Sequence, residues 1–271
     1  MTAELARRAA VARTFLFVPG TRPDRFDKAA ASGADLVVLD LEDAVAGNEK
    51  NAARENVVGW LADGGRAAVV RVNSLTSTHW AADIAAVAAA GAVIMVPKAE
   101  DPHALAELGD KTPVIALIET ARGVLAAPAI SSVHGVVRTA LGHIDLAAEI
   151  GVDPDERPAL LLARSTLVMA AAAAGIDSPI DGVTTNMTDS TILESDVFYA
   201  KSLGFSGKLC IHPTQIDSAR IALTPTAAEV AWAEKVAASL SVGGGVTSID
   251  GHMIDPPVVA RAARILATAT R

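Results

Sequence analysis

Short apolar runs alternate with longer Ala-rich stretches along the whole chain. The runs are continuous in Val, Ile and Leu rather than strictly alternating with polar residues, which is typical of strands buried on both faces of a parallel sheet. They predict eight strands, at 14–18, 35–40, 67–72, 92–96, 113–118, 135–141, 180–184 and 207–211. Helices are predicted between them, for example at 23–32, 49–61, 78–90, 102–108, 157–174, 188–203 and 213–222.

Eight strand–helix units in series predict an α/β fold of the (β/α)8 TIM-barrel type, and the 271 residues suit such a barrel. An open doubly wound sheet is the alternative, but no G-x-G-x-x-G follows the first strand and no Walker A sequence occurs. A helix at 226–240, a glycine-rich hinge at 241–245 and a last helix from Pro256 follow the eighth unit. We therefore expect a catalytic barrel over 1–240 and, as part of the same domain, a hinge and C-terminal helical extension over 241–271. The extension is either a lid or arm for a neighbouring subunit or a plain covering helix.

Composition narrows the class of partner. The chain is 51% hydrophobic with a net charge of −8, which favours a large core and argues against nucleic acid or an anionic membrane as the main partner. The single cysteine, Cys210, excludes an intramolecular disulfide and is interpreted as a core residue. Residues 1–13 lack the apolar run of a secretory signal, and the apolar segment 159–175 is short for a membrane span. We expect a cytoplasmic protein.

Ionisable residues follow five successive predicted strands, from the second to the sixth. In chain order they are Glu42 and Asp43, Arg71, Lys98, Glu119, and Asp145. Barrel enzymes carry their catalytic groups at these strand ends, and a buried charge is costly unless it is paired or binds a ligand. The series therefore predicts an active site, with a ring of salt bridges closing the barrel mouth as the alternative.

The residue types indicate which chemistry each position could supply. Glu119 and Asp145 are the candidate metal ligands, because Mg²⁺ is commonly held by one or two carboxylates with water and substrate oxygens. Arg71 would face an anionic substrate, since guanidinium binds a carboxylate bidentately. Lys98 would either balance the carboxylates, which we favour, or act as a Schiff-base nucleophile. His212 is interpreted as a turn-capping residue rather than a catalytic one.

Several motifs at these positions resemble one known family. The matching segments are Leu16-Phe-Val-Pro-Gly20 with Arg22-Pro-Asp-Arg-Phe26, Leu39-Asp-Leu-Glu-Asp-Ala-Val45, Arg71-Val-Asn73, Pro97-Lys98, Ile118-Glu-Thr-Ala-Arg-Gly123, Lys208-Leu-Cys-Ile-His-Pro213 and Asp250-Gly-His-Met-Ile-Asp-Pro-Pro257. They resemble the citrate lyase beta-subunit-like proteins of the HpcH/HpaI aldolase/citrate lyase family, in order and over nearly the whole chain. The resemblance implies a TIM barrel, a Mg²⁺ ion, commonly a homotrimer, and the making or breaking of a carbon–carbon bond between a 2-keto acid and an acyl-CoA.

The resemblance also implies roles for individual residues. Glu119 and Asp145 would be the metal ligands, and Arg71 would hold a carboxylate or the thioester oxygen. Glu42 and Asp43 would support the metal's waters and the keto acid. The loop with Arg22 and Arg25, and the His212-Pro213 turn, would lie near the coenzyme A chain. Asp255 would act as general acid/base in a neighbouring subunit's site, although an aspartate at that position could equally cap the helix from Pro256.

These assignments predict a Mg²⁺-dependent carbon–carbon lyase. Its reaction would be the retro-Claisen cleavage, or the reverse condensation, of a 3-hydroxy-3-carboxyacyl-CoA such as malyl-CoA or citramalyl-CoA. The alternatives are a thioesterase or a non-CoA aldolase on the same metal site, a Schiff-base aldolase through Lys98, and a non-catalytic partner subunit. Two departures from the family pattern bear on the substrate: Ile144 replaces an acidic neighbour of Asp145, and Asn186 replaces a frequent aspartate.

Overall fold

The computed structural model describes residues 2–63, 67–239, 247–249 and 251–269. All eight predicted strands are present and form a closed parallel barrel in chain order, in which β1 pairs with β8. The strands are β1 (Thr14–Pro19), β2 (Leu36–Asp40), β3 (Val69–Arg71), β4 (Val93–Val96), β5 (Val114–Ile118), β6 (Val136–Leu141), β7 (Ile180–Asp181) and β8 (Gly207–Cys210). The predicted (β/α)8 fold is therefore confirmed.

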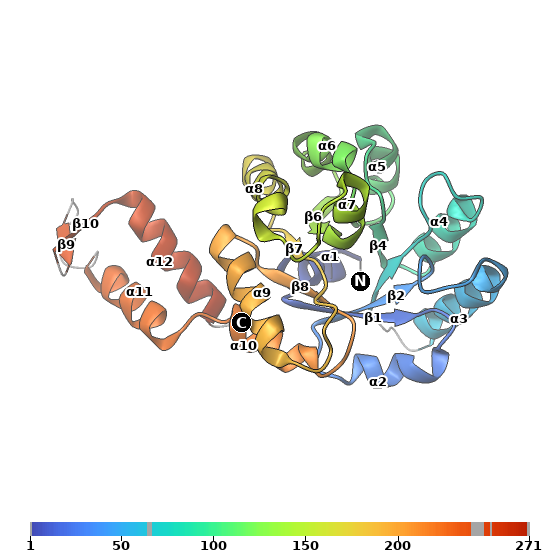
Figure 1. Cartoon of the computed structure of the whole chain (residues 1–271), viewed down its shortest axis with the longest axis horizontal. Helices are drawn as coiled ribbons and strands as arrows, with labels where there is room; N and C mark the ends of the chain where they lie inside the picture. Colours follow the sequence, from blue (N-terminus) through green and yellow to red (C-terminus); the bar gives the residue numbers. More distant parts are fainter. Residues whose placement is uncertain (1, 64–66, 240–246, 250, 270–271) are drawn as a thin grey trace. The chain divides into compact units, whose positions relative to one another are not determined.

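Helices cover the outside of the barrel, and Figure 1 shows them following one another round it in the order of the chain. They are α2 (Phe26–Ala30), α3 (Lys50–Ala62), α4 (Trp80–Ala89), α5 (Pro102–Gly109), α6 (Ala121–Ser131), α7 (His143–Ile150), α8 (Arg157–Ala174), α9 (Ser190–Leu203) and α10 (Gln215–Leu223). Two short 3-10 turns, η1 (Pro23–Arg25) and η2 (Gly47–Glu49), precede α2 and α3. The helices α6 and α7 were not among the segments given as predicted helices; α6 begins two residues after Glu119, and α7 contains Asp145 in its first turn.

An additional helix, α1 (Thr2–Val11), covers the end of the barrel at which the strands begin. Its residues Leu5 and Ala9 belong to the same buried cluster as Phe15, Val69 and Ile115, from three different strands. The cluster is almost wholly aliphatic, in line with the 3% aromatic content of the chain. With one end of the barrel filled by α1, the site must be sought at the opposite end.

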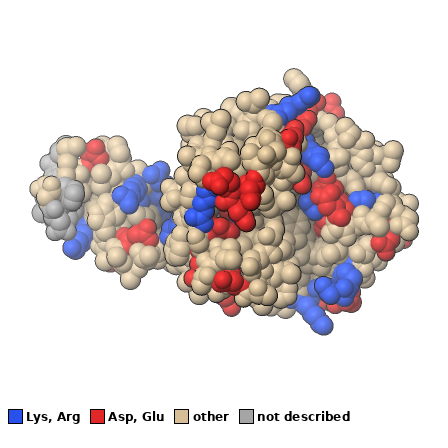
Figure 2. Space-filling view, in the orientation of Figure 1, with Lys and Arg blue, Asp and Glu red and all other residues tan. Residues whose placement is uncertain are grey.

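The helix α8 is long and apolar enough to cross a membrane by length and composition, the one such helix in the described part of the chain. In this fold it packs against α6 and β6, and its residues Leu160, Leu167 and Ala171 are buried. Packing on the barrel accounts for this buried face, whereas Leu162 and Met169 of the same helix are exposed. The face of the molecule in Figure 2 carries Lys and Arg interspersed with Asp and Glu on a largely uncharged surface.

The chain divides into two compact units, Met1–Arg220 and Ile221–Arg271. The second unit contains α11 (Ala227–Ser239), a hairpin of β9 (Thr247–Ile249) and β10 (His252–Ile254), and α12 (Pro256–Ala269). A small apolar core that includes Ala233, Val236 and Ala262 joins α11 to α12. The two units divide after Arg220, whereas the sequence pattern starts the C-terminal extension at residue 241. The predicted hinge at 241–245 lies outside the described residues.

Candidate active site

Strand register places Asp40 beside Arg71 at the carboxyl ends of β2 and β3. Arg71 donates from Nε to Asp40 Oδ1 at 2.7 Å and from Nη2 to Asp40 Oδ2 at 2.8 Å, a bidentate pair. The guanidinium also lies over the Phe17 ring, 4.9 Å from its centroid. These contacts hold Arg71 rigidly, which leaves Nη1 as the end of the guanidinium available to another group.

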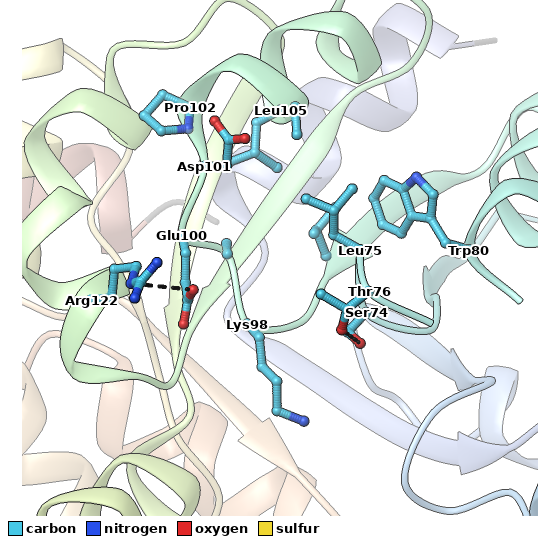
Figure 3. Close-up of a pocket in the computed structure, with 13 residues that line it drawn as sticks. Ser74, Leu75, Thr76, Trp80, Lys98, Glu100, Asp101, Pro102, Leu105 and Arg122 are labelled. Atoms are coloured by element: carbon cyan, nitrogen blue, oxygen red, sulfur yellow. Dashed lines mark hydrogen bonds and ion pairs between the residues drawn. The ribbon is translucent and has the colours of Figure 1, made fainter. Parts of the chain in front are cut away.

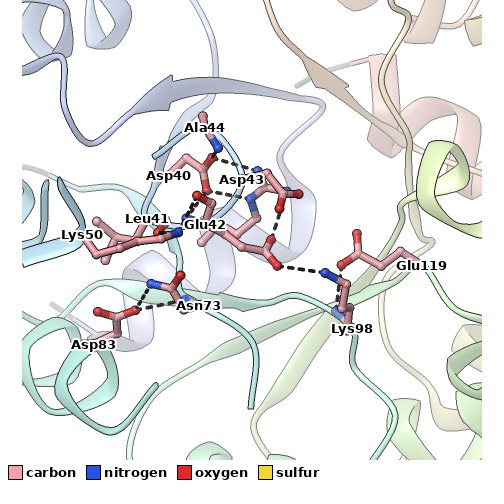
Figure 4. A network of polar contacts seen from close by, with 11 residues as sticks. Asp40, Leu41, Glu42, Asp43, Ala44, Lys50, Asn73, Asp83, Lys98 and Glu119 are labelled. Atoms are coloured by element: carbon pink, nitrogen blue, oxygen red, sulfur yellow. Dashed lines mark hydrogen bonds and ion pairs between the residues drawn. The ribbon is translucent and has the colours of Figure 1, made fainter. Parts of the chain in front are cut away.

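The loop after β2 is fixed by its own backbone contacts, as Figure 4 shows. The Asp40 carboxylate accepts the N–H groups of Glu42 and Ala44 at 2.9 and 3.0 Å. Lys50 donates to the carbonyl oxygens of Leu41 and Glu42 at 2.8 and 2.7 Å. The Glu42 side chain is thereby held 3.4 Å from Arg71 Nη1 and 3.4 Å from Lys98 Nζ.

The Glu119 side chain is buried at the end of β5, where three features position it. Its Oε1 accepts the backbone N–H of Lys98 at 2.8 Å, and Lys98 has a left-handed backbone with φ of 47°. Gly142 follows the adjacent strand, and a Cβ there would lie 2.5 Å from Glu119 Oε2. The space beside Glu119 therefore depends on glycine at 142, and the strain at Lys98 serves to point its N–H at this carboxylate.

A cavity of about 420 Å³ opens at this end of the barrel. Its lining brings together four of the predicted residues: Arg71, Asp43, Glu119 and Asp145. The remaining lining is largely apolar, with Phe17, Leu117, Leu141, Ile144, Val183, Leu209 and Ile211. Glu42 and Lys98 stand behind this lining and join it through their contacts with Arg71 and Glu119.

Burial and mutual repulsion disfavour ionisation of the acids at this site. Burial, opposed by Arg71, raises the pKa of Glu42 to about 7. Burial together with the charges of Glu42 and Asp145 raises the pKa of Glu119 to about 8. Burial lowers the pKa of Lys98, but Glu42 and Glu119 outweigh it, so that the pKa of the amine is raised overall. Lys98 is therefore protonated at neutral pH, which favours charge balance over a Schiff-base role.

The donor set at the mouth fits a hard divalent cation. Glu119 and Asp145 line the same cavity, and a cation between them would relieve the repulsion that raises the pKa of Glu119. Within the described residues no group of three or more His, Cys, Asp or Glu is placed to hold a metal. Two carboxylates with open positions suit Mg²⁺, which keeps several waters and takes further oxygens from its substrate, better than zinc.

Other predicted residues lie outside this cavity. Arg22 pairs with Asp24 at 2.8 Å on the loop after β1, and neither it nor Arg25 contributes to the lining. His212 is exposed, and its Nδ1 lies 2.8 Å from Thr214 Oγ1, while Pro213 continues the same turn toward α10. These contacts agree with the capping role favoured for His212.

Asp255 belongs to the second unit, where it stands directly before α12. Its Oδ1 accepts the N–H of Val258 at 3.1 Å, which is the hydrogen bond of a helix N-cap. Capping occupies one carboxylate oxygen. The structure thus supports the capping role, and the catalytic role stays a prediction.

The sequence pattern missed three residues that shape the site. Asp40 ends a predicted strand and was passed over, although it fixes both Arg71 and the Glu42 loop. Gly142 was not singled out, because its value depends on what lies across the sheet. His143 is buried beside the cavity, and burial lowers its pKa to about 4, so the imidazole is neutral.

A second cavity of about 530 Å³ lies next to Lys98, between the loops after β3 and β4. Figure 3 shows Trp80 and Leu75 on one side of it and Glu100 with Arg122 on the other, while Lys98 extends away from both. Glu100 and Arg122 approach to 3.8 Å. This cavity is formed by surface loops and carries none of the buried carboxylates.

The fold and the first cavity define the class of protein: a TIM barrel with an acidic site at the carboxyl ends of its strands. The model of the HpcH/HpaI aldolase/citrate lyase family matches residues 13–213, and the chain belongs to that family. A citrate lyase subunit beta-like protein of Mycobacterium tuberculosis is 38% identical over 259 residues, covering 93% of each chain. A (3S)-malyl-CoA thioesterase of Cereibacter sphaeroides is 34% identical over 278 residues, covering 98% of this chain and 97% of its own.

A solved structure shows the same architecture. The crystal structure of CitE from Mycobacterium tuberculosis, in complex with magnesium, acetoacetate and coenzyme A, superimposes with a TM-score of 0.86. It is 37% identical in sequence, and the match covers 97% of this chain and 100% of that one. The family predicted from the motifs is therefore confirmed.

Proposed function

We propose that this protein makes or breaks the carbon–carbon bond of a 3-hydroxy-3-carboxyacyl-CoA, with a 2-keto acid and an acyl-CoA as the other side of the reaction. One observation carries the proposal: the buried Glu119, whose pKa is raised, lines a cavity at the barrel mouth together with a rigid arginine, Arg71. Malyl-CoA and citramalyl-CoA are the model substrates. Structures of the related CitE in complex with magnesium and acetoacetate or oxaloacetate support the reaction class.

Glu119 and Asp145 would hold a magnesium ion. When bound, it would act as a Lewis acid toward the carboxylate and the keto or hydroxyl oxygen of the substrate. Glu119 must give up its proton to bind the cation, and the raised pKa makes that step dependent on pH. Lys98 Nζ, 3.4 Å from Glu42, lowers the repulsion around the two ligands without joining them.

Arg71 would stabilise the charge that develops during cleavage. As the bond breaks, electrons pass to the thioester carbonyl, and the oxygen of the resulting enolate needs a fixed positive partner. Arg71 lines the cavity, and Asp40 holds its Nε and Nη2 in place. Glu42 and Asp43, 3.4 and 3.7 Å from the same Nη1, position it and the keto-acid end.

Two further assignments concern coenzyme A and the subunits. Arg22 and Arg25 would contact the phosphates of coenzyme A, with His212 and Pro213 beside its pantetheine chain. Asp255 would exchange the proton at the acyl carbon from a neighbouring subunit, which fits a homotrimer. A cytoplasmic location fits the single, fully buried cysteine, for which burial raises the pKa to about 12.

The proposal is tested by turnover with a panel of acyl-CoA and keto-acid pairs, with magnesium or EDTA, followed by mass spectrometry. A chelator-sensitive hydroxyacyl-CoA product is expected. Asp145→Ala should abolish the metal-dependent turnover while the fold, checked by circular dichroism, is kept. Full activity of Asp145→Ala would contradict the metal assignment. Absence of product in a folded, metal-loaded protein would favour a partner subunit that lacks catalysis.

Thioester hydrolysis is the second candidate, because the Cereibacter relative is named a (3S)-malyl-CoA thioesterase. The same acids could orient a water toward the thioester carbonyl instead of releasing an enolate. The products separate the two reactions: malyl-CoA gives glyoxylate and acetyl-CoA by cleavage, but malate and free coenzyme A by hydrolysis. A free hydroxy-keto acid cleaved without coenzyme A would instead indicate a non-CoA aldolase.

A further inference from the structure

The cavity wall beside the two candidate metal ligands is apolar. The helix α7 begins at His143, and its first turn brings Ile144 and Asp145 to the same cavity. Ile144 is partly exposed there, and Val183 and Leu141 share the lining. A ligand that reaches Asp145 therefore meets aliphatic surface immediately beside it.

The positive charge in the cavity lining is already surrounded by carboxylates. Arg71 is the one lysine or arginine in the lining formed by the described residues. Both Asp40 oxygens bind it, and Glu42 and Asp43 lie within 3.7 Å of its remaining nitrogen. Lys98 turns its amine to Glu42, 3.4 Å away. A second substrate carboxylate would find acids here but no unpaired cation.

We propose that the site takes a 2-keto acid whose third substituent is uncharged and apolar, and that Ile144 packs against that substituent. The inference rests on the proposed function: a keto acid held through its carboxylate and keto oxygen at Glu119 and Asp145 would have its third group in the same cavity, which Ile144 also lines. A methyl or short alkyl group gains contact with Ile144. A carboxymethyl group would lose its hydration there, and no cationic partner would offset that free-energy cost.

The test compares keto acids matched in size. In 4-methyl-2-oxopentanoate and oxaloacetate the third substituent has the same number of non-hydrogen atoms, and only the latter carries a charge on it; pyruvate supplies the methyl case. Binding to the magnesium-loaded protein is measured by titration calorimetry. Condensation with acetyl-CoA is measured by mass spectrometry, which distinguishes the oxaloacetate product from that of any pyruvate formed from it. Pyruvate and 4-methyl-2-oxopentanoate should each bind at least about 10-fold more tightly than oxaloacetate.

Two variants locate the effect. Ile144→Ala should weaken binding of 4-methyl-2-oxopentanoate about 10-fold and leave oxaloacetate unchanged. Ile192→Ala is the control, because Ile192 is also partly exposed and lines the neighbouring cavity of about 240 Å³ but not this one. It should change neither.

The outcomes separate the inference about keto-acid preference from the proposed lyase activity. Equal or tighter binding of oxaloacetate, or no effect of Ile144→Ala, overturns the inference even if the lyase reaction is found. The expected binding order without any condensation product supports the inference and counts against the proposed lyase activity. Failure of every keto acid to bind overturns both.

Discussion

The barrel contains two buried acids whose pKa values are shifted in opposite directions. They are Asp181 at the end of β7 and Glu119 at the end of β5. Burial raises the pKa of Asp181, but Lys208 at 2.7 Å and the paired Arg164 outweigh it, so that this carboxyl has a lowered pKa. Glu119 is equally buried but faces other acids, and its pKa is raised to about 8. Burial of a charge alone therefore does not mark a functional residue. A buried charge that no nearby side chain fully neutralises does mark a functional residue, because a ligand can then supply the opposite charge.

The largest expected effect is on stability, from the neutralised cluster. Lys208→Met leaves the buried Asp181 with Arg164 alone, and should lower the free energy of unfolding by about 3 to 5 kcal/mol. Urea unfolding followed by circular dichroism measures it. Lys28→Met, at an exposed position on α2, is the control and should stay within about 0.5 kcal/mol of wild type. A small loss for Lys208→Met would show that the cluster is not structural.

The next effect is on activity, from the cluster without full neutralisation. Glu119→Gln removes a proposed magnesium ligand and should lower kcat/KM by at least about 100-fold. Unlike Lys208→Met, it should leave the free energy of unfolding unchanged or higher, because it removes a carboxylate that is repelled by its neighbours. Glu107→Gln on the exposed face of α5 is the matched control. Retained activity, or strong destabilisation, of Glu119→Gln would contradict a functional role for Glu119 and a structural role for Asp181.

The pH dependence of stability sharpens the comparison further. The pKa of Glu119 rises from an ordinary 4.5 to about 8, so the folded protein holds a proton that the unfolded chain has already lost between these values. In metal-free protein, the stability that the Glu119 proton contributes to the folded state is fully present below pH 4.5 and is lost as pH rises through about 8. The slope is at most about 1.4 kcal/mol per pH unit. Melting temperatures in EDTA, for wild type against Glu119→Gln, isolate this contribution; parallel curves would contradict it.

The smallest effect is expected at a mouth residue whose hydrogen bonds are satisfied. Asn186 Oδ1 accepts the N–H groups of Thr188 and Asp189, both at 2.9 Å, in the loop before α9. An aspartate oxygen can accept the same bonds, so Asn186→Asp should change stability by no more than about 0.5 kcal/mol and leave kcat/KM near wild type. A large loss of activity, measured in the same assay, would place the Asn186 amide against the substrate.

Much of the barrel could be predicted because each strand is a local apolar run ended by a polar residue. The strands β4 and β5, for instance, begin within one residue of their predicted starts, and α8 spans the predicted residues 157–174. The helices α6 and α7 were missed because Pro128 and the short length of α7 obscure their periodicity. The grouping of Arg71, Asp43, Glu119 and Asp145 could also be predicted, since parallel strands deliver their carboxyl ends to one rim.

The protonation state of the site could not be predicted from the chain. It depends on contacts between distant segments. Asp40 accepts hydrogen bonds from two nitrogens of Arg71, and Glu119 accepts one from the backbone N–H of Lys98. The burial of His143 against β7, near Gly182, is of the same kind. Local sequence specifies which side chains reach the rim, and packing across the barrel then decides their charge.

The buried Arg138 in β6 bears on the order in which the barrel folds. Its guanidinium donates to the Ala12 and Ser178 carbonyls and to Ser206 Oγ, so it ties β6 to the segments before β1, β7 and β8. Ala12 is 126 residues away along the chain. Contacts of such separation carry a high loop-closure cost and form late. The contacts of Arg138 should therefore form last. Loss of Arg138 should raise the rate at which β1 and β8 separate more than it lowers the rate at which the preceding units fold.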